Sequence, residues 1–141
     1  MPFFCHDVTD RSVRVPLDEE KTAHSSGVLG VSSLTVIVKD GEALREVRRV
    51  YDSLFGDAAE AQDGLVRYEA KRVVPVKELD GAGGAQILLR VAQNESEREK
   101  VGERGFLYGD VVLAAKAGNG KKQGRKEKID SDLRGLWLEY V

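Results

Sequence analysis

Apolar side chains follow two different spacings in the first part of the chain, and each spacing predicts one element. Residues 27–40, GVLGVSSLTVIVKD, are rich in β-branched side chains and contain an apolar run without alternation, which is typical of a strand covered on both faces. Asp40, of a residue type that caps helix N-termini, then precedes an apolar stripe at helical spacing that ends at Gly56. The stripe consists of Leu44, Val47, Val50, Tyr51, Leu54 and Phe55. We predict a central strand followed by an amphipathic helix of about four turns.

The next two apolar runs predict a pair of strands. Residues 65–76, LVRYEAKRVVPV, alternate loosely between apolar and polar positions, and Pro75 indicates an edge or the end of a strand. The glycine-rich segment 79–86, LDGAGGAQ, lacks the spacing and the following Lys-Ser/Thr of a phosphate-binding loop. We therefore interpret it as a hairpin turn. The run 85–93, AQILLRVAQ, is predicted to pair back as the next strand.

The last part of the chain predicts a short helix and two more strands. Asn94, with Glu97 three residues later, forms a capping pair at the start of that helix. The apolar run 106–115 and the terminal run 133–141, LRGLWLEYV, are the predicted strands. Between them, residues 116–128 hold six basic side chains against one acid among glycines, which favours a solvated loop.

This order of elements predicts an α+β fold and differs from the repeated strand-helix alternation of dinucleotide-binding domains. We expect a β-α-β-β-β module with a curved, antiparallel-rich mixed sheet, one main helix on its convex face and an added C-terminal strand. Residues 1–26, which contain Pro2 and Pro16, are predicted as an N-terminal lead-in segment. Residues 27–141 form the single predicted module, with a flexible basic loop at 116–132.

Composition limits the classes of partner. A chain of 141 residues, 41% hydrophobic and 33% charged, is typical of one soluble domain with its own core. A net charge of −2 gives no overall field for nucleic acid or an anionic membrane. There is no apolar stretch of membrane-spanning length and no signal-peptide pattern. The single cysteine, Cys5, has no internal disulfide partner. We expect a cytoplasmic protein that binds neither nucleic acid nor a membrane.

The N-terminal stretch CHDVTDRSVRVP carries an Asp-x-Thr-x-Arg-x-x-Arg-Val-Pro run. The run consists of Asp7, Thr9, Arg11, Arg14, Val15 and Pro16. A His followed by Gly-Val and a strand comes next, as His24, Gly27 and Val28. Residues 103–113, ERGFLYGDVVL, are similar to the Arg-Gly strand that ends a glyoxalase-like module. Over about residues 3–115 the chain resembles the second module of a glyoxalase-like domain of the vicinal oxygen chelate superfamily.

The resemblance implies a fold that is completed by a second module. Two β-α-β-β-β modules of this superfamily join into a cupped sheet that encloses a small-molecule site. A homodimer or a second glyoxalase-like module is therefore the implied partner. Enzymes of the family that use a divalent metal place it against two substrate oxygens, where it acts as a Lewis acid.

The residues that the resemblance assigns to metal binding depart from the family pattern. Where a His or Gln ligand would project from the first strand, this sequence has Ser33. The acid in the matching last strand is Asp110, and Glu139 in the terminal strand is a further candidate. Such oxygen donors suit hard cations better than transition metals, so these ligands do not support the divalent metal that the resemblance implies.

Three residues near the N-terminus are candidates for acid–base catalysis. His6 is adjacent to Asp7, and a carboxylate can orient an imidazole that titrates near neutral pH. Neighbours in an extended segment point to opposite sides, however, so a structural histidine is the alternative. His24 is the other candidate, and a surface-loop histidine is its alternative. Cys5, beside two Phe residues, is interpreted as an inert buried thiol rather than a nucleophile.

Arg11 and Arg14 are the candidate ligand-binding residues. Either guanidinium could hold a ligand carboxylate in a bidentate contact. The alternative is that both pair with Asp7 or Asp10 and fix the lead-in segment. The basic loop could bind an anion or nucleic acid, but it contains no aromatic side chain for base stacking.

Two functions follow from these observations. The first is a glyoxalase-like lyase or isomerase that acts on a small oxygen-rich metabolite. The second is a non-catalytic module of the same fold that binds or sequesters a small molecule, and the missing first-strand ligand favours it. A structural half-domain that only completes a partner is a third possibility.

Overall fold

The computed structural model describes residues 8–10, 13, 25–56, 58–60, 64–70, 84–117, 120, 122–129 and 135–141. The strands are β1 (Val28–Val38), β2 (Ala59–Glu60), β3 (Val66–Ala70), β4 (Ala85–Val91), β5 (Phe106–Ala115), β6 (Lys126–Lys128) and β7 (Leu136–Tyr140). The two helices placed among them are α3 (Gly41–Phe55) and α4 (Glu95–Arg104). None of the described helices is long and apolar enough to cross a membrane.

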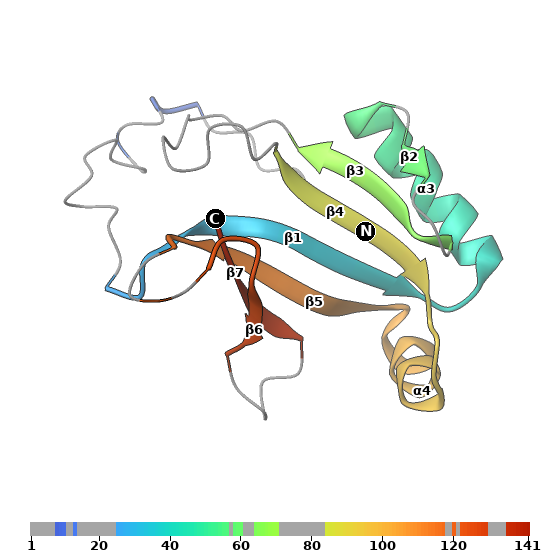
Figure 1. Ribbon diagram of the computed structural model, residues 1–141. Coiled ribbons are helices and arrows are strands. Elements are labelled where there is room, and N and C mark those ends of the chain that lie inside the picture. The colour runs from blue at the N-terminus through green and yellow to red at the C-terminus, as the bar shows by residue number, and fades with distance from the viewer. Residues whose placement is uncertain are drawn as a thin grey trace.

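All described strands belong to one mixed sheet in the order β2-β3-β4-β1-β5-β7-β6 (Figure 1). β1 lies at its centre, parallel to β4 and antiparallel to β5. β3 pairs antiparallel with β4, from Val66 opposite Leu89 to Ala70 opposite Ala85. β7 is added parallel to β5 at the other side. The α+β class, the mixed sheet and the added C-terminal strand are therefore confirmed.

The main helix begins and ends where the sequence predicts. The Asp40 side chain accepts hydrogen bonds from the backbone N–H groups of Glu42 and Ala43, at 3.0 and 2.9 Å. These bonds, with that to Ala43 first, lower the pKa of the Asp40 carboxyl. Gly56 ends the helix with φ +83°, a left-handed value that a side chain would disfavour.

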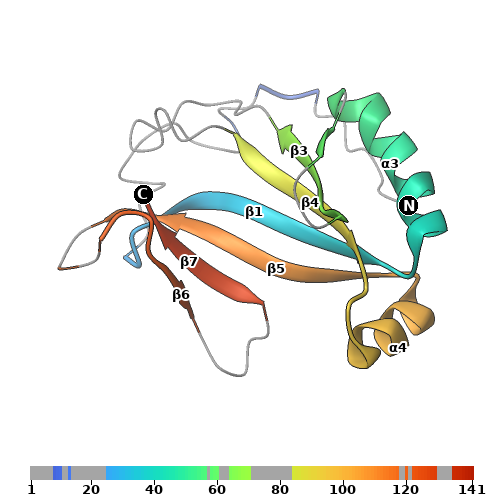
Figure 2. The same cartoon turned by 45° about the vertical axis from the view of Figure 1, so that its right-hand side comes forward.

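Two apolar clusters cover opposite faces of the sheet. Consecutive residues of β1 point to opposite faces, and Val36 belongs to one cluster while Ile37 belongs to the other. On the first face, Leu44, Val47 and Tyr51 of α3 pack over β3 and β4. On the second, Val101 of α4 packs against Ile37, with Leu107 beside them. Figure 2 shows the two helices on either side of the sheet. The prediction that β1 is covered on both faces is confirmed.

One segment differs from its prediction. Residues 126–128 fall inside the stretch predicted as a flexible loop, but they form β6, antiparallel to β7. Lys126 lies opposite Glu139 and forms an ion pair with it at 3.4 Å. Charged residues are accepted in this strand because it is at the edge of the sheet. The basic character of the segment therefore indicated its exposure, not the absence of a strand.

Candidate functional site

The candidate residues of the lead-in segment lie outside the described residues. These are Cys5, His6, Asp7, Arg11, Arg14 and His24. The catalytic roles of the histidines and of Asp7 stay predictions, and so does ligand binding by the two arginines. The described candidates are Ser33, Asp110 and Glu139, on β1, β5 and β7.

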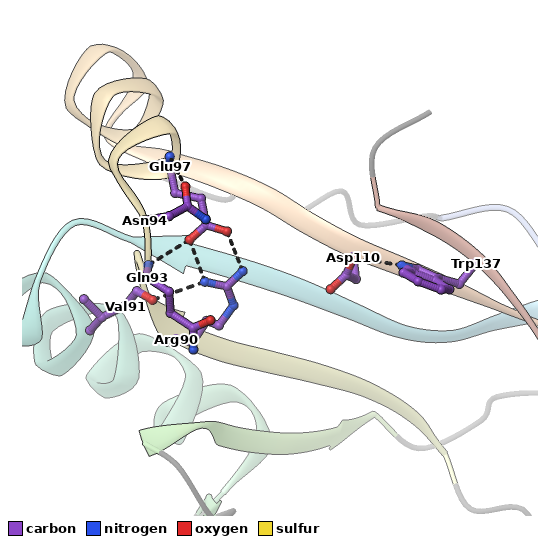
Figure 3. Close-up of polar contacts among 7 residues, drawn as sticks. All are labelled: Arg90, Val91, Gln93, Asn94, Glu97, Asp110 and Trp137. Carbon is purple, nitrogen blue, oxygen red and sulfur yellow. Dashed lines mark hydrogen bonds and ion pairs between the residues drawn. The ribbon is translucent and has the colours of Figure 1, made fainter. Parts of the chain in front are cut away.

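These three strands are neighbours, but two of the three side chains already have partners. Ser33 is buried on β1, opposite Val112 of β5. Asp110 Oδ1 accepts a hydrogen bond of 2.9 Å from Trp137 Nε1 (Figure 3). One oxygen of Glu139 accepts from the Ser32 hydroxyl at 2.9 Å, and the other lies 3.4 Å from the Lys126 ammonium.

The described part of the chain contains no group of three or more His, Cys, Asp or Glu side chains placed to hold a metal ion. Ser33 offers a neutral hydroxyl, and both oxygens of Glu139 are engaged. Metal binding by Ser33, Asp110 and Glu139 stays a prediction, and no chemical step is derived through a metal.

A hollow of about 420 Å³ lies between α4 and β5, on the face of the sheet that α4 covers. We call it the α4–β5 hollow. Its lining comprises Ile37, Arg90, Asn94, Ser96, Glu97, Lys100, Leu107, Tyr108, Gly109, Asp110 and Gly135. These residues come from the centre of the sheet, from α4 and from the residue that precedes β7. The hollow therefore lies where three parts of the chain that are distant in sequence meet.

A β-bulge places Asp110 in this lining. Between the pairs Leu34–Val111 and Val36–Tyr108, β5 has two residues, Gly109 and Asp110, where β1 has one. Such an extra residue bends a strand and redirects a side chain. Gly109 also fits closely, because a Cβ built there would lie 2.9 Å from Ile37 Cδ1. The bulge and the missing side chain of Gly109 together bring the Asp110 carboxylate to the hollow.

An ion pair forms the wall on the side of α4. Arg90 Nη1 and Nη2 donate to the two carboxylate oxygens of Glu97, each at 2.8 Å (Figure 3). Glu97 also accepts from the Gln93 backbone N–H at 2.8 Å, and its own N–H donates to the Asn94 side chain at 2.9 Å. The pair connects the end of β4 to the first turn of α4.

This bonding sets the charge of both partners. The hydrogen bonds from Arg90 are the largest cause that lowers the pKa of Glu97 to about 2; the Gln93 N–H also lowers this pKa, while burial acts in the opposite direction. The same contact raises the pKa of Arg90, and the nearby Asp110 carboxylate adds to that rise. Both groups of the pair are therefore charged over the whole physiological range.

Lys100 and Asp110 are the other two charged side chains among the described residues of the lining. Lys100 is half-buried on α4, and no ion-pair partner for it occurs among the described residues. Asp110 Oδ1 has the Trp137 N–H as its donor, while Oδ2 has none within the described ranges. Because Arg90 and Glu97 neutralise each other, the described residues of the lining present one cation and one anion to a ligand.

Arg90, Glu97 and Lys100 line the hollow, but none of them was predicted as a site residue from the sequence. Arg90 is a charged residue inside the otherwise apolar strand ILLRVA, and this is the signal that would have identified it. Glu97 was predicted as half of a capping pair. Its bond to Arg90 forms because the turn between β4 and α4 brings the two side chains together, and the sequence pattern does not show this. Nothing in the pattern distinguishes Lys100 from the other charged residues of α4.

Comparisons with known proteins identify no family. No protein-family model matches the chain, and no curated protein matches it. Among the solved structures, the chain is similar to methylmalonyl-CoA epimerase from Mycobacterium tuberculosis. The two are 15% identical, the alignment covers 88% of this chain and 94% of the other, and the TM-score is 0.45. Likeness at this level carries no argument about activity, so the glyoxalase-like resemblance stays a prediction.

Proposed function

We propose that this chain is a glyoxalase-like module that binds a small oxygen-rich metabolite in the α4–β5 hollow. The observation that carries the proposal is the bulge at Gly109 and Asp110, which brings an acceptor with a free oxygen to a hollow that also has a cation. Bulges next to binding sites commonly serve to aim a side chain. The module itself is supported by the Asp7–Pro16 run and by the order of the strands.

The dimensions and lining of the hollow favour a small molecule over a macromolecule. Its volume of about 420 Å³ falls within the range of about 300–1,000 Å³ that is usual for small-molecule sites. The lining contains the apolar side chains Ile37 and Leu107 and the ring of Tyr108, but its polar and charged side chains, Arg90, Asn94, Ser96, Glu97, Lys100 and Asp110, are more numerous. Polar contacts would therefore contribute more to binding here than in the predominantly apolar sites that are usual for small molecules.

Within this proposal, binding without catalysis is favoured over a metal-dependent lyase or isomerase. The specific observation is that Trp137 occupies one oxygen of Asp110, and Ser32 and Lys126 occupy those of Glu139. We expect protein purified without chelator to contain Zn, Ni, Mn and Fe well below one ion per chain. Stoichiometric metal that is lost in Asp110→Ala would instead support the lyase or isomerase.

Binding in the hollow can be tested by NMR titration of the ¹⁵N-labelled chain with a panel of small carboxylic acids, alcohols and amines. We expect saturable shifts at lining residues such as Lys100, Asp110 and Gly135. Ser96→Trp should weaken binding, because it places a large side chain in the lining. Glu99→Trp is the matched control, since Glu99 is exposed on the same helix and is not part of the lining. Equal binding by both variants, or no shifts in the lining, would contradict the proposal.

We further propose that a second module, most simply a second copy of this chain, completes the site, and that the protein acts in the cytoplasm. Two aromatic side chains on β5 support the first part. Phe106 and Tyr108 are 42% and 60% exposed and contact each other edge to face, with ring centroids 5.2 Å apart. Exposed aromatic residues are enriched where proteins meet. The single cysteine, Cys5, supports a reducing compartment.

A further inference from the structure

We propose that Trp137 is a positioning residue of the α4–β5 hollow: its indole N–H holds the Asp110 carboxylate so that the other oxygen, Oδ2, receives a hydrogen-bond donor of the ligand. β7, the strand added after the predicted β-α-β-β-β module, then belongs to the binding site. The inference rests on the proposed function, because it assigns the group that orients the acid of that site.

The first step is the direct contact between the two side chains. Trp137 lies opposite Val112 of β5, and Asp110 is two residues before Val112. Residues two apart along a strand project from the same face of a sheet, so the indole extends along the face that carries Asp110. Its Nε1 donates to Asp110 Oδ1 at 2.9 Å (Figure 3). Nε1–H is the single donor of the indole ring, so Asp110 takes all of its hydrogen-bonding capacity.

The second step is the backbone that holds β7 in place. Gly135 precedes β7 and is part of the lining of the hollow. Its carbonyl oxygen accepts a hydrogen bond from the Val111 N–H, and a Cβ built on Gly135 would lie 2.8 Å from the Gly109 carbonyl oxygen. The entry to β7 therefore contacts the β5 neighbours of Asp110 on both sides. These contacts fix the indole of Trp137 relative to the bulged residue.

The third step is the oxygen that Trp137 leaves available. An ionised carboxylate accepts hydrogen bonds at both oxygens and donates none. Oδ2 of Asp110 has no donor among the described residues, although Asp110 is part of the lining. The hydrogen bonds to Glu97, and then the Asp110 carboxylate, raise the pKa of Arg90, so Asp110 is within electrostatic reach of another lining residue. A ligand that displaces water from Oδ2 must replace the lost donor, because a buried acceptor left without one is costly.

The fourth step is what the fixed orientation contributes. A carboxylate that rotates freely loses this freedom when a ligand binds, and the loss weakens binding. The bond from Trp137 restricts that rotation in the folded protein before a ligand arrives. A bond that only strengthened the pairing of β5 and β7 would have no such effect on the affinity for a hydrogen-bond donor, and this difference makes the inference testable.

The first test uses the NMR signal of the indole N–H, which is unambiguous because the chain contains one tryptophan. The ¹⁵N-labelled full chain is titrated with propylamine, propan-1-ol and propionate, three probes of similar size. Protonated propylamine and the alcohol donate hydrogen bonds, whereas propionate only accepts them. We expect the two donors to shift the indole signal and the backbone signals of Gly109 and Gly135 with one common dissociation constant. Propionate should leave the indole signal unchanged.

The second test is a double-mutant cycle on the affinity for the donor that binds more tightly. Trp137→Phe keeps an aromatic ring but lacks the N–H group, and we expect it to weaken binding at least about fivefold, as a coupling of about 1 kcal/mol would. In the Asp110→Ala background the same substitution should have no further effect, because Trp137 acts through Asp110. A packing role of Trp137 would instead weaken binding in both backgrounds.

Tyr140→Phe is the matched control on the same strand. It also removes a side-chain hydrogen bond of β7, the bond of 3.1 Å to Glu127, but neither residue is part of the lining. Its affinity for the probes should equal that of the unmodified chain. Circular dichroism and thermal melts show whether each variant is folded. If Trp137→Phe unfolds, the indole titration of the unmodified chain decides the inference by itself.

The outcomes distinguish the inference from the proposed function. If a donor shifts backbone signals of the lining but not the indole signal, the inference is overturned while binding in the hollow stands. The same follows if Trp137→Phe binds as tightly as the unmodified chain, or weakens binding equally in both backgrounds. It also follows if propionate, or another compound of the panel that lacks a donor, shifts lining residues and no donor does. No shift of a lining residue with any compound would overturn both.

Discussion

Glu97 connects the start of α4 to β4 through several hydrogen bonds. It accepts two hydrogen bonds from Arg90 and one from the Gln93 N–H, while its own N–H donates to Asn94. A single side chain thus bonds to the end of β4, to the turn and, through its backbone, to the helix cap. The two bonds from Arg90 are strongest when the carboxylate is charged, so the link between α4 and β4 depends on its ionisation.

Replacing this carboxylate should destabilise the protein. Glu97→Gln keeps the shape but removes the charge, so we expect the free energy of unfolding to fall by about 2 kcal/mol, the usual magnitude for hydrogen bonds to charged groups. Urea unfolding measures it. Glu95→Gln is the control in the same turn of α4, because the Glu95 side chain is 92% exposed and should contribute little. Equal losses in the two variants would show that the bonds to Glu97 do not stabilise the fold.

The lowered pKa of Glu97 also predicts how stability changes with pH. The carboxyl has a pKa of about 2 in the folded chain against an ordinary value of 4.5. A depressed folded pKa contributes stability that is present above the ordinary value and is lost as pH falls towards the folded one. We expect a loss of stability between about pH 4.5 and 2 that is smaller in Glu97→Gln, as measured by urea unfolding across that range. If the free energy of unfolding fell equally with pH in the unmodified chain and in Glu97→Gln, Glu97 would not be the source of this pH dependence.

At the scale of elements, the bulged β5 and the entry to β7 depend on each other through two glycines. Gly135 has φ +81°, and a Cβ built on it would lie 2.8 Å from the carbonyl oxygen of Gly109. Its own carbonyl accepts a hydrogen bond from the Val111 N–H, directly after the bulge. This close backbone contact holds β7 against the bulged strand and forms one side of the hollow.

The contact predicts different effects for two glycine substitutions. Gly135→Ala should destabilise by about 1–3 kcal/mol more than Gly124→Ala, because overpacking against backbone adds to the cost of a left-handed conformation. Gly124 has a similar φ of +79°, but nothing lies within 4 Å of a Cβ built there. Thermal and urea unfolding of both variants measure the difference. If the two substitutions lower the free energy of unfolding equally, Gly135 does not pack tightly against the Gly109 backbone.

The elements differ in how far the sequence predicts them. The continuous apolar run of β1 and the caps of α3 and α4 are local signals, and the structure confirms them. β6 was missed because Lys126, Glu127 and Lys128 carry no apolar pattern and take their place only by pairing with β7. The bulge at Asp110 could not be predicted from the sequence either, because a bulge depends on how β5 is aligned with β1. The described part of the candidate site is formed by such pairings between distant parts of the chain. The sequence therefore shows which residue types are present, but not which of them lie close together.

At the scale of the whole molecule, the proposed second module predicts a mass in solution. We expect light scattering to give twice the mass of one chain, with Tyr108→Lys shifting the protein towards monomer because a charge would then lie in an aromatic contact. Glu99→Lys, exposed on α4, is the control and should leave the mass unchanged. A stable monomer at all concentrations would remove the proposal that two copies of this chain complete the site.

The β6 edge has a consequence for how such molecules can meet. β6 is the outermost strand on one side of the sheet and alternates Lys126, Glu127 and Lys128. Lysines on an outer strand discourage another chain from adding its own strand there, because like charges would be brought together. The charged β6 edge is therefore expected to oppose edge-to-edge aggregation of the sheets of different molecules on this side.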